Sequence, residues 1–169
     1  MISGDACGLE LGKSRTEALQ KWGEGLMRTL RMGFALIAYL LFFAAFLYLF
    51  AFTGNLFGEV ARLTGAQDLA NLPSIDYGPA ASPTVAILVN IGLIALFGIQ
   101  HSVMARSGFK SWLTQFWPAA IERSLYVMAT VVVLVLLFAY WRPITPLVWS
   151  AEAPWLRTLL WALFFAGWA

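Results

Sequence analysis

The side chains that could do chemistry are concentrated in residues 99–126. This stretch collects the only histidine of the chain and four charged residues: His101, Arg106, Lys110, Glu122 and Arg123. An imidazole accepts a proton near neutral pH, and closely spaced cations can hold an anion such as a carboxylate or phosphate. Because long apolar runs lie on both sides, where ionisable groups are costly and usually functional, we take this stretch as the candidate site.

Each of these residues also has a purely structural interpretation. His101 could be hydrogen-bonded to a neighbouring helix or to the headgroup region, and Arg106 and Lys110, one helical turn apart, could serve only to set membrane topology. Glu122 needs a partner, for which Arg106, Lys110 or His101 would serve if their helices pack antiparallel. A structural ion pair explains such a partner as well as catalysis does.

The same residues argue against several other kinds of site. A bis-histidine haem needs a second histidine, which the chain lacks, and no zinc-ligand spacing occurs, so we predict no metal. Patterns typical of nucleotide-binding loops, serine hydrolases and zinc proteases are missing as well. The single cysteine, Cys7, cannot form an internal disulfide, and we interpret it as incidental.

Composition places the chain in a lipid bilayer. It is 60% hydrophobic and 12% charged, far from the roughly 45–50% and 25% of soluble domains. We therefore expect one integral membrane domain with the bilayer as its partner. The formal net charge is only +2, and the basic residues sit beside apolar runs, so no nucleic-acid partner is expected.

The apolar runs predict an all-α, polytopic transmembrane helix bundle of about four spans. The expected spans are residues 32–53, 84–105, 118–141 and 155–169. A helix rises about 1.5 Å per residue, so the last run reaches only some 22 Å of a hydrocarbon core of about 30 Å. We therefore expect the fourth span to be incomplete and the chain to be a fragment of a longer protein.

The connections and the helix faces give further expectations. Residues 54–83, rich in Gly, Asn, Asp and Pro, predict a loop, and Pro118 is expected to be the first residue of the third span. Asn90 and His101 are eleven residues apart, within about 20° on a helical wheel, so they should share a face with Phe97.

Residues 1–31 are interpreted as a polar cytoplasmic N-terminal tail. The pairs Glu17–Lys21 and Glu24–Arg28 would support a short surface helix, and Met27 is an alternative translation start. Basic residues are most frequent in this tail and in the connection 106–123, so the positive-inside rule puts both in the cytoplasm.

Three segments carry a resemblance to a known family: QHSVMARSGFKSW at 100–112, PAAIERSLYV at 118–127 and WRPI at 141–144, with FxGN at 52–55 in support. With these the chain resembles the bacterial membrane methanethiol S-methyltransferases, which group with the NnrU-like proteins and, more distantly, the isoprenylcysteine carboxyl methyltransferases. The resemblance covers about Met27 to the end and implies a multi-pass protein of the bacterial inner (cytoplasmic) membrane.

The resemblance also implies a reaction, the methylation of methanethiol by S-adenosyl-L-methionine to give dimethyl sulfide. His101 would then be the base that activates the thiol, and Glu122 would hold the imidazole or stabilise the positive sulfonium. Arg106 or Arg123, with Lys110, would anchor the carboxylate of the cofactor. Members of the family are longer and build the cofactor site largely from C-terminal helices with an Arg-His-Pro and tyrosine motif. That motif is missing here, so we expect the cofactor-binding residues to lie beyond Ala169.

Three other functions stay open on the sequence. The methyl acceptor could be a larger thiol or a prenyl-cysteine carboxylate. The chain could instead be an NnrU-like membrane protein of nitrogen-oxide metabolism, associated with haem or acting as an accessory subunit. It could also be a non-catalytic membrane subunit in which the polar cluster only locks two helices together.

Overall fold

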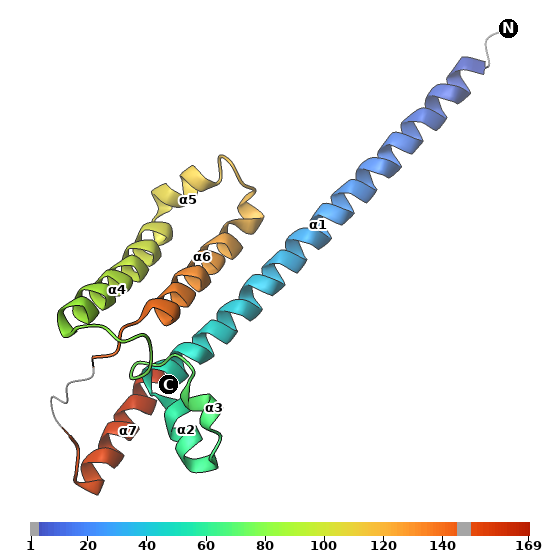
Figure 1. Ribbon diagram of the computed structural model, residues 1–169. Coiled ribbons are helices and arrows are strands. Elements are labelled where there is room, and N and C mark those ends of the chain that lie inside the picture. Colours follow the sequence, from blue (N-terminus) through green and yellow to red (C-terminus); the bar gives the residue numbers. More distant parts are fainter. Residues whose placement is uncertain (1–3, 145–149) are drawn as a thin grey trace.

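Helices account for all the regular structure in the computed structural model, which describes residues 4–144 and 150–169 (Figure 1). The elements are α1 (Gly4–Thr53), α2 (Leu56–Thr64), α3 (Gln67–Ala70), α4 (Pro83–Ala105), α5 (Ser107–Leu113), α6 (Ala119–Tyr140) and α7 (Pro154–Trp168). Side chains are described from Leu19 onward, so those of Cys7 and Glu17, on which two expectations rest, lie outside the described residues. The predicted all-α membrane fold is confirmed.

Three of the described helices are long and apolar enough to cross a membrane: residues 19–53 of α1, all of α4 and all of α6. Their ends agree with the predicted spans within two residues, except at the start of α1. The fourth predicted span corresponds to α7, a helix of 15 residues. Pro118 precedes α6 as its N-cap residue, with ψ of 137°, and so lies one residue before the predicted position.

The expected short surface helix is instead part of one long helix, α1. α1 runs unbroken for 50 residues, so the helix does not change at residue 31, where the polar tail gives way to the apolar span. No proline interrupts this segment, which lets the helix continue. The expected Glu24–Arg28 pair does not form in the described structure, because Glu24 Oε1 instead accepts a hydrogen bond from Gln20 Nε2 at 3.1 Å.

The predicted loop 54–83 contains two short helices, α2 and α3, and this expectation was wrong in its first half. The three prolines of the segment all follow α3, so nothing prevents helix formation between residues 56 and 70. Asn55, in the left-handed conformation with φ of 48°, makes the turn between α1 and α2. Gly65, with φ of 76°, ends α2 and donates its N–H to Ala61 O.

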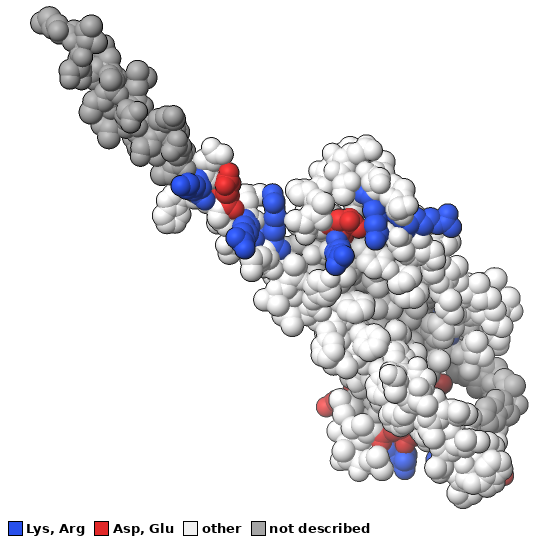
Figure 2. Space-filling model, turned by 180° about the vertical axis from the view of Figure 1, so that it is seen from behind, with Lys and Arg blue, Asp and Glu red and all other residues white. Residues whose placement is uncertain are grey.

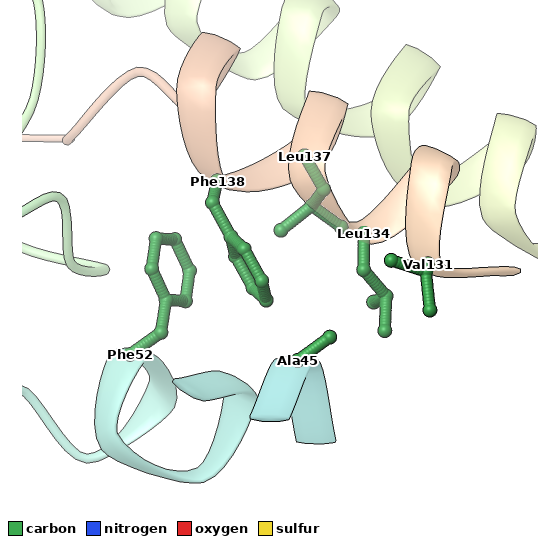
Figure 3. Packing of buried hydrophobic residues seen from close by; sticks show 6 residues of the cluster. All are labelled: Ala45, Phe52, Val131, Leu134, Leu137 and Phe138. Atoms are coloured by element: carbon green, nitrogen blue, oxygen red, sulfur yellow. The ribbon is translucent and has the colours of Figure 1, made fainter. Parts of the chain in front are cut away.

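α6 is the central helix, because α1 packs on one side of it and α4 on the other. The core lies along the contact between α1 and α6, where two residues of α1 face four of α6 (Figure 3): Ala45, Phe52, Val131, Leu134, Leu137 and Phe138. α7 contacts α1 through aromatic rings, for example those of Phe50 and Phe164, whose centroids are 5.2 Å apart. A Cβ on Gly54 would lie 2.9 Å from Phe164 Cζ, so a larger residue there would displace the Phe164 ring.

The end of the bundle that contains Phe52 is held together by backbone contacts; we call it the Phe52 end. Trp141 packs edge-on against Phe52 and donates from Nε1 to Ile75 O at 3.1 Å. The Asn90 amide donates to Arg142 O at 2.8 Å and accepts from Arg142 N at 2.9 Å. Two of the motifs behind the resemblance, FxGN and WRPI, thus lie together in a structural junction.

Charged side chains gather in two zones separated by a belt without charge (Figure 2). Among residues with described side chains, the zone formed by residues 21–31 and 106–123 has six basic and two acidic residues. The zone at the Phe52 end has three basic and four acidic residues. An uncharged belt between charged zones is the pattern of a membrane-spanning bundle.

Candidate functional site

The opposite end of the bundle, which we call the His101 end, brings most of the predicted site residues together. α4 and α6 are antiparallel and joined by residues 106–118, so the last turns of α4 lie beside the first turns of α6. Antiparallel packing over a short connection was the condition on which the predicted Glu122 contacts depended. The site is therefore a product of the helix hairpin and not of any single element.

His101 is hydrogen-bonded to a residue that the sequence analysis did not name. The hydroxyl of Tyr126 lies 2.7 Å from His101 Nδ1 and 3.3 Å from Nε2, and the tautomer of the imidazole decides which group donates. The ring of Phe97, one turn earlier on α4, stacks on the imidazole with centroids 5.8 Å apart. The His101 ring therefore stacks on Phe97 and is hydrogen-bonded to the Tyr126 hydroxyl.

Glu122 pairs with Lys110, which was one of its three predicted partners. Glu122 Oε1 lies 3.9 Å from Lys110 Nζ; the carboxylate side chain is 19% exposed and the lysine 47%. Between Glu122 and His101, both described, the structure has no hydrogen bond or ion pair, so the expectation that Glu122 holds the imidazole is not met. Tyr126 occupies that place because it follows Glu122 by four residues on the same face of α6.

A cavity of about 130 Å³ lies between these side chains. It is lined by Ala105, Lys110, Glu122, Arg123 and Tyr126. Three of the five predicted site residues therefore share one cavity, whereas Arg106 and the exposed His101 do not line it. The i, i+4 relation between Glu122 and Tyr126 in the ERSLYV segment was the signal that could have revealed Tyr126.

A second polar contact between the two helices lies one turn deeper. Gln100 Nε2 is within hydrogen-bond distance of Thr130 Oγ1 at 3.4 Å and of Met104 Sδ at 3.2 Å, while Gln100 Oε1 has no partner in the structure. Asn90 shares the helix face of His101 as predicted but bonds the backbone at the Phe52 end. Eleven residues of helix separate the two by about 16 Å, so Asn90 is not part of this site.

Among residues whose side chains the structure describes, no group of three or more His, Cys, Asp or Glu could hold a metal ion. The available chemistry is that of one imidazole, one phenol, one carboxylate and nearby cations. These groups can move a proton and bind a small polar ligand.

Comparison with known proteins gives this arrangement a family context. The chain is 40% identical over 144 residues to the methanethiol S-methyltransferase of Mycobacterium tuberculosis, a match that covers 85% of this chain and 54% of the relative. It is 42% identical over 135 residues to the enzyme of the same name from a Pseudomonas species, a match that covers 80% of this chain and 47% of the relative. The chain is a homologue of the methanethiol S-methyltransferases. This confirms the resemblance seen in the sequence motifs.

The chain is also similar to an animal protein, and each match covers only part of the relative. Nurim of Sus scrofa is 35% identical over 95 residues, which is 48% of this chain and 36% of that protein. The chain spans about half the length of the first bacterial relatives that it matches. No family model matches the chain, and no solved structure matches it.

The described cavity is too small for the whole cofactor that a methyltransferase would use. Sites for ligands of that size enclose about 300–1,000 Å³, whereas the cavity here measures about 130 Å³. This cavity by itself therefore does not enclose S-adenosyl-L-methionine, and its volume is that of a ligand of a few heavy atoms.

Proposed function

We propose that this chain contributes the thiol-binding part of an integral membrane methyltransferase, which uses S-adenosyl-L-methionine to methylate a small thiol. The acceptor would be methanethiol and the product dimethyl sulfide. The observation that carries the proposal is the homology to several proteins named methanethiol S-methyltransferase. The small cavity lined by Tyr126 and Glu122 supports it, because its volume suits a two-heavy-atom thiol.

Activation of the thiol is the step that the described residues could perform. An alkyl thiol is mostly protonated near neutral pH, while the thiolate is the nucleophile. Tyr126 faces the cavity and its hydroxyl reaches His101 Nδ1 at 2.7 Å. We therefore assign a relay: the thiol proton passes to the Tyr126 oxygen as the proton of the phenol passes to His101 Nδ1. The S–H bond breaks, imidazolium forms, and the sulfur is left as thiolate.

The charged residues around the cavity would tune this step. Glu122, held by Lys110, supplies a negative charge that stabilises the imidazolium and suits a cationic methyl donor. Arg123 lines the same cavity, and Arg106 lies at the adjoining start of α5; with Lys110 they are candidates for holding the carboxylate of the cofactor. S-adenosyl-L-methionine would supply the methyl group itself.

We also propose that the protein is a multi-pass protein of the bacterial cytoplasmic membrane with its N-terminus and the His101 end in the cytoplasm. Six of the nine described basic side chains lie in the zone of the His101 end. Cytoplasmic loops carry such an excess of Lys and Arg. The site would then face the compartment that holds S-adenosyl-L-methionine.

The experiment is methylation by membranes from cells that produce the complete product of the gene encoding this chain. Labelled S-adenosyl-L-methionine is supplied with methanethiol, a larger thiol or a prenyl-cysteine, and dimethyl sulfide is measured in the headspace. We expect label in dimethyl sulfide and a loss of about 10²–10⁴-fold in His101→Ala. Ser102→Ala, a neighbouring exposed side chain, is the matched control.

Other outcomes of this experiment would point elsewhere. Label in a larger product but not in dimethyl sulfide would replace the acceptor while keeping the reaction class. No transfer to any acceptor, together with a Soret band in the purified protein, would favour the NnrU-like alternative. Full activity in His101→Ala would remove His101 from the mechanism.

A further inference from the structure

We propose that the protein binds an anionic glycerophospholipid in a groove between α1 and the start of α6. The groove encloses about 640 Å³ and is lined on α1 by one face of the helix, with Ala120 of α6 opposite. This site is separate from the cavity beside Tyr126, and the inference does not depend on the proposed methyltransferase activity.

The first argument is the position of the groove relative to the membrane. Its lining on α1 runs from Gln20 to Ala35 and so crosses the start of the apolar run at Met32. Arg28 and Arg31 therefore lie at the level of lipid headgroups, and Met32 and Ala35 lie where the hydrocarbon region begins. A lipid with its phosphate at Arg31 would place the first carbons of an acyl chain along Met32 and Ala35.

The second argument is charge. Arg28 and Arg31 both line the groove, on the half nearest the apolar run. Glu24, the one acidic residue of the lining, lies one turn farther from the membrane and is hydrogen-bonded to Gln20. Two guanidinium groups one turn apart favour a phosphate, which they can bind through several N–H donors.

The third argument is shape. Met27, Met32 and Ala35 on α1 and Ala120 on α6 form most of the apolar wall. The alanines leave space where larger side chains would close the gap between the helices. A flexible acyl chain fills such an irregular apolar groove, and methionine adapts readily to it.

A second depression on α1 provides a control residue. Lys21 belongs to the same helix and the same charged zone, but it lines a different depression together with Trp22, Gly25 and Leu26. A general attraction between basic residues and anionic lipid would depend on Lys21 as well as on Arg31, although less strongly because Lys21 lies about 15 Å farther from the apolar run. A specific groove would not.

The test is a lipid titration of the purified full chain in detergent micelles, followed by native mass spectrometry. Dioleoyl phosphatidylglycerol is compared with dioleoyl phosphatidylcholine, which has the same acyl chains and no net charge. We expect tighter binding of phosphatidylglycerol, weakened about fivefold by each of Arg28→Gln and Arg31→Gln and unchanged by Lys21→Gln. Ala35→Trp, which fills the groove without changing charge, should also weaken binding.

Three results would overturn the proposal. Equal affinity for the two lipids would remove the role of the arginines. A measurable weakening of binding by Lys21→Gln would show diffuse attraction to the whole basic zone. Displacement of the lipid by inorganic phosphate at the same concentration would show an anion site without an acyl-chain groove. Circular dichroism of each of the four variants verifies that the helices are intact.

Discussion

His101 and Tyr126 form the contact on which the proposed chemistry depends. The imidazole does not line the cavity, whereas the phenol does, and their atoms are 2.7 Å apart. A base that reaches its substrate through another side chain needs both members of the pair. At the residue scale, therefore, Tyr126 is the addition that the structure makes to the list of site residues.

Tyr126→Phe tests this relay because it removes one oxygen and keeps the ring. We expect thiol methylation to fall by about 10²–10⁴-fold, as far as in His101→Ala, and the double variant to be no slower than either single variant. The measurement is the rate of dimethyl sulfide release at saturating thiol. If the loss of rate in the double variant were the product of the two single losses, the two residues would not share one proton path.

Glu122→Gln separates a catalytic from a structural carboxylate. The ion pair with Lys110 is long, at 3.9 Å, and the lysine is half exposed, so its loss should change the free energy of unfolding by about 0–1 kcal/mol. We expect methylation to fall while the melting temperature in detergent stays nearly unchanged. Lowered stability with full activity would instead assign Glu122 to helix packing alone.

At the scale of elements, α6 organises the molecule. It packs against α1 through the apolar core and against α4 through Leu93 and Phe97, with polar contacts toward both ends. The Tyr126 contact lies near its beginning and the Arg142 backbone contact just after its last residue. The relative position of α4 and α6 is thus held at both ends, which keeps the cavity of the His101 end in shape.

Asn90→Ala tests the contact at the Phe52 end. It leaves one N–H and one C=O of Arg142 without their partners, and we expect a loss of about 1–3 kcal/mol in the free energy of unfolding. Unfolding in mixed micelles measures it, with Ile91→Val, an exposed neighbour on α4, as control. An unchanged unfolding midpoint in Asn90→Ala would show that water or lipid replaces the amide.

At the scale of the whole molecule, the belt without charge defines how the bundle sits in a bilayer. Basic residues dominate one charged zone and acidic residues slightly outnumber them in the other. The charge difference predicts that the His101 end faces the cytoplasm. The uncharged belt also leaves many large apolar side chains of α1, α4 and α7 exposed, as suits contact with lipid or further helices.

Cysteine labelling tests this orientation, because the chain has a single natural cysteine, Cys7. We expect an impermeant maleimide to label Cys7 only after the cells are permeabilised. Leu63→Cys, placed on exposed α2 in a Cys7→Ser background, should be labelled in intact cells. The reverse pattern would put the N-terminus outside and refute the proposed cytoplasmic site.

The sequence by itself determined the helices that cross the membrane, because apolar run length and flanking prolines are local properties. It also located the stretch that contains the candidate site, and the proteins to which the chain is related. It missed α2 and α3, because the composition of residues 54–83 was read as a whole, although the prolines occupy only the second half.

Only the tertiary structure decided which polar groups meet. His101 contacts Tyr126 and not Glu122, Glu122 contacts Lys110, and Asn90 bonds the backbone of Arg142. Partner choice depends on the rotation and axial offset of two packed helices, and a difference of one residue turns a side chain by about 100°. Those two quantities are set by the packing of α6 between α1 and α4, which no local pattern in the sequence contains.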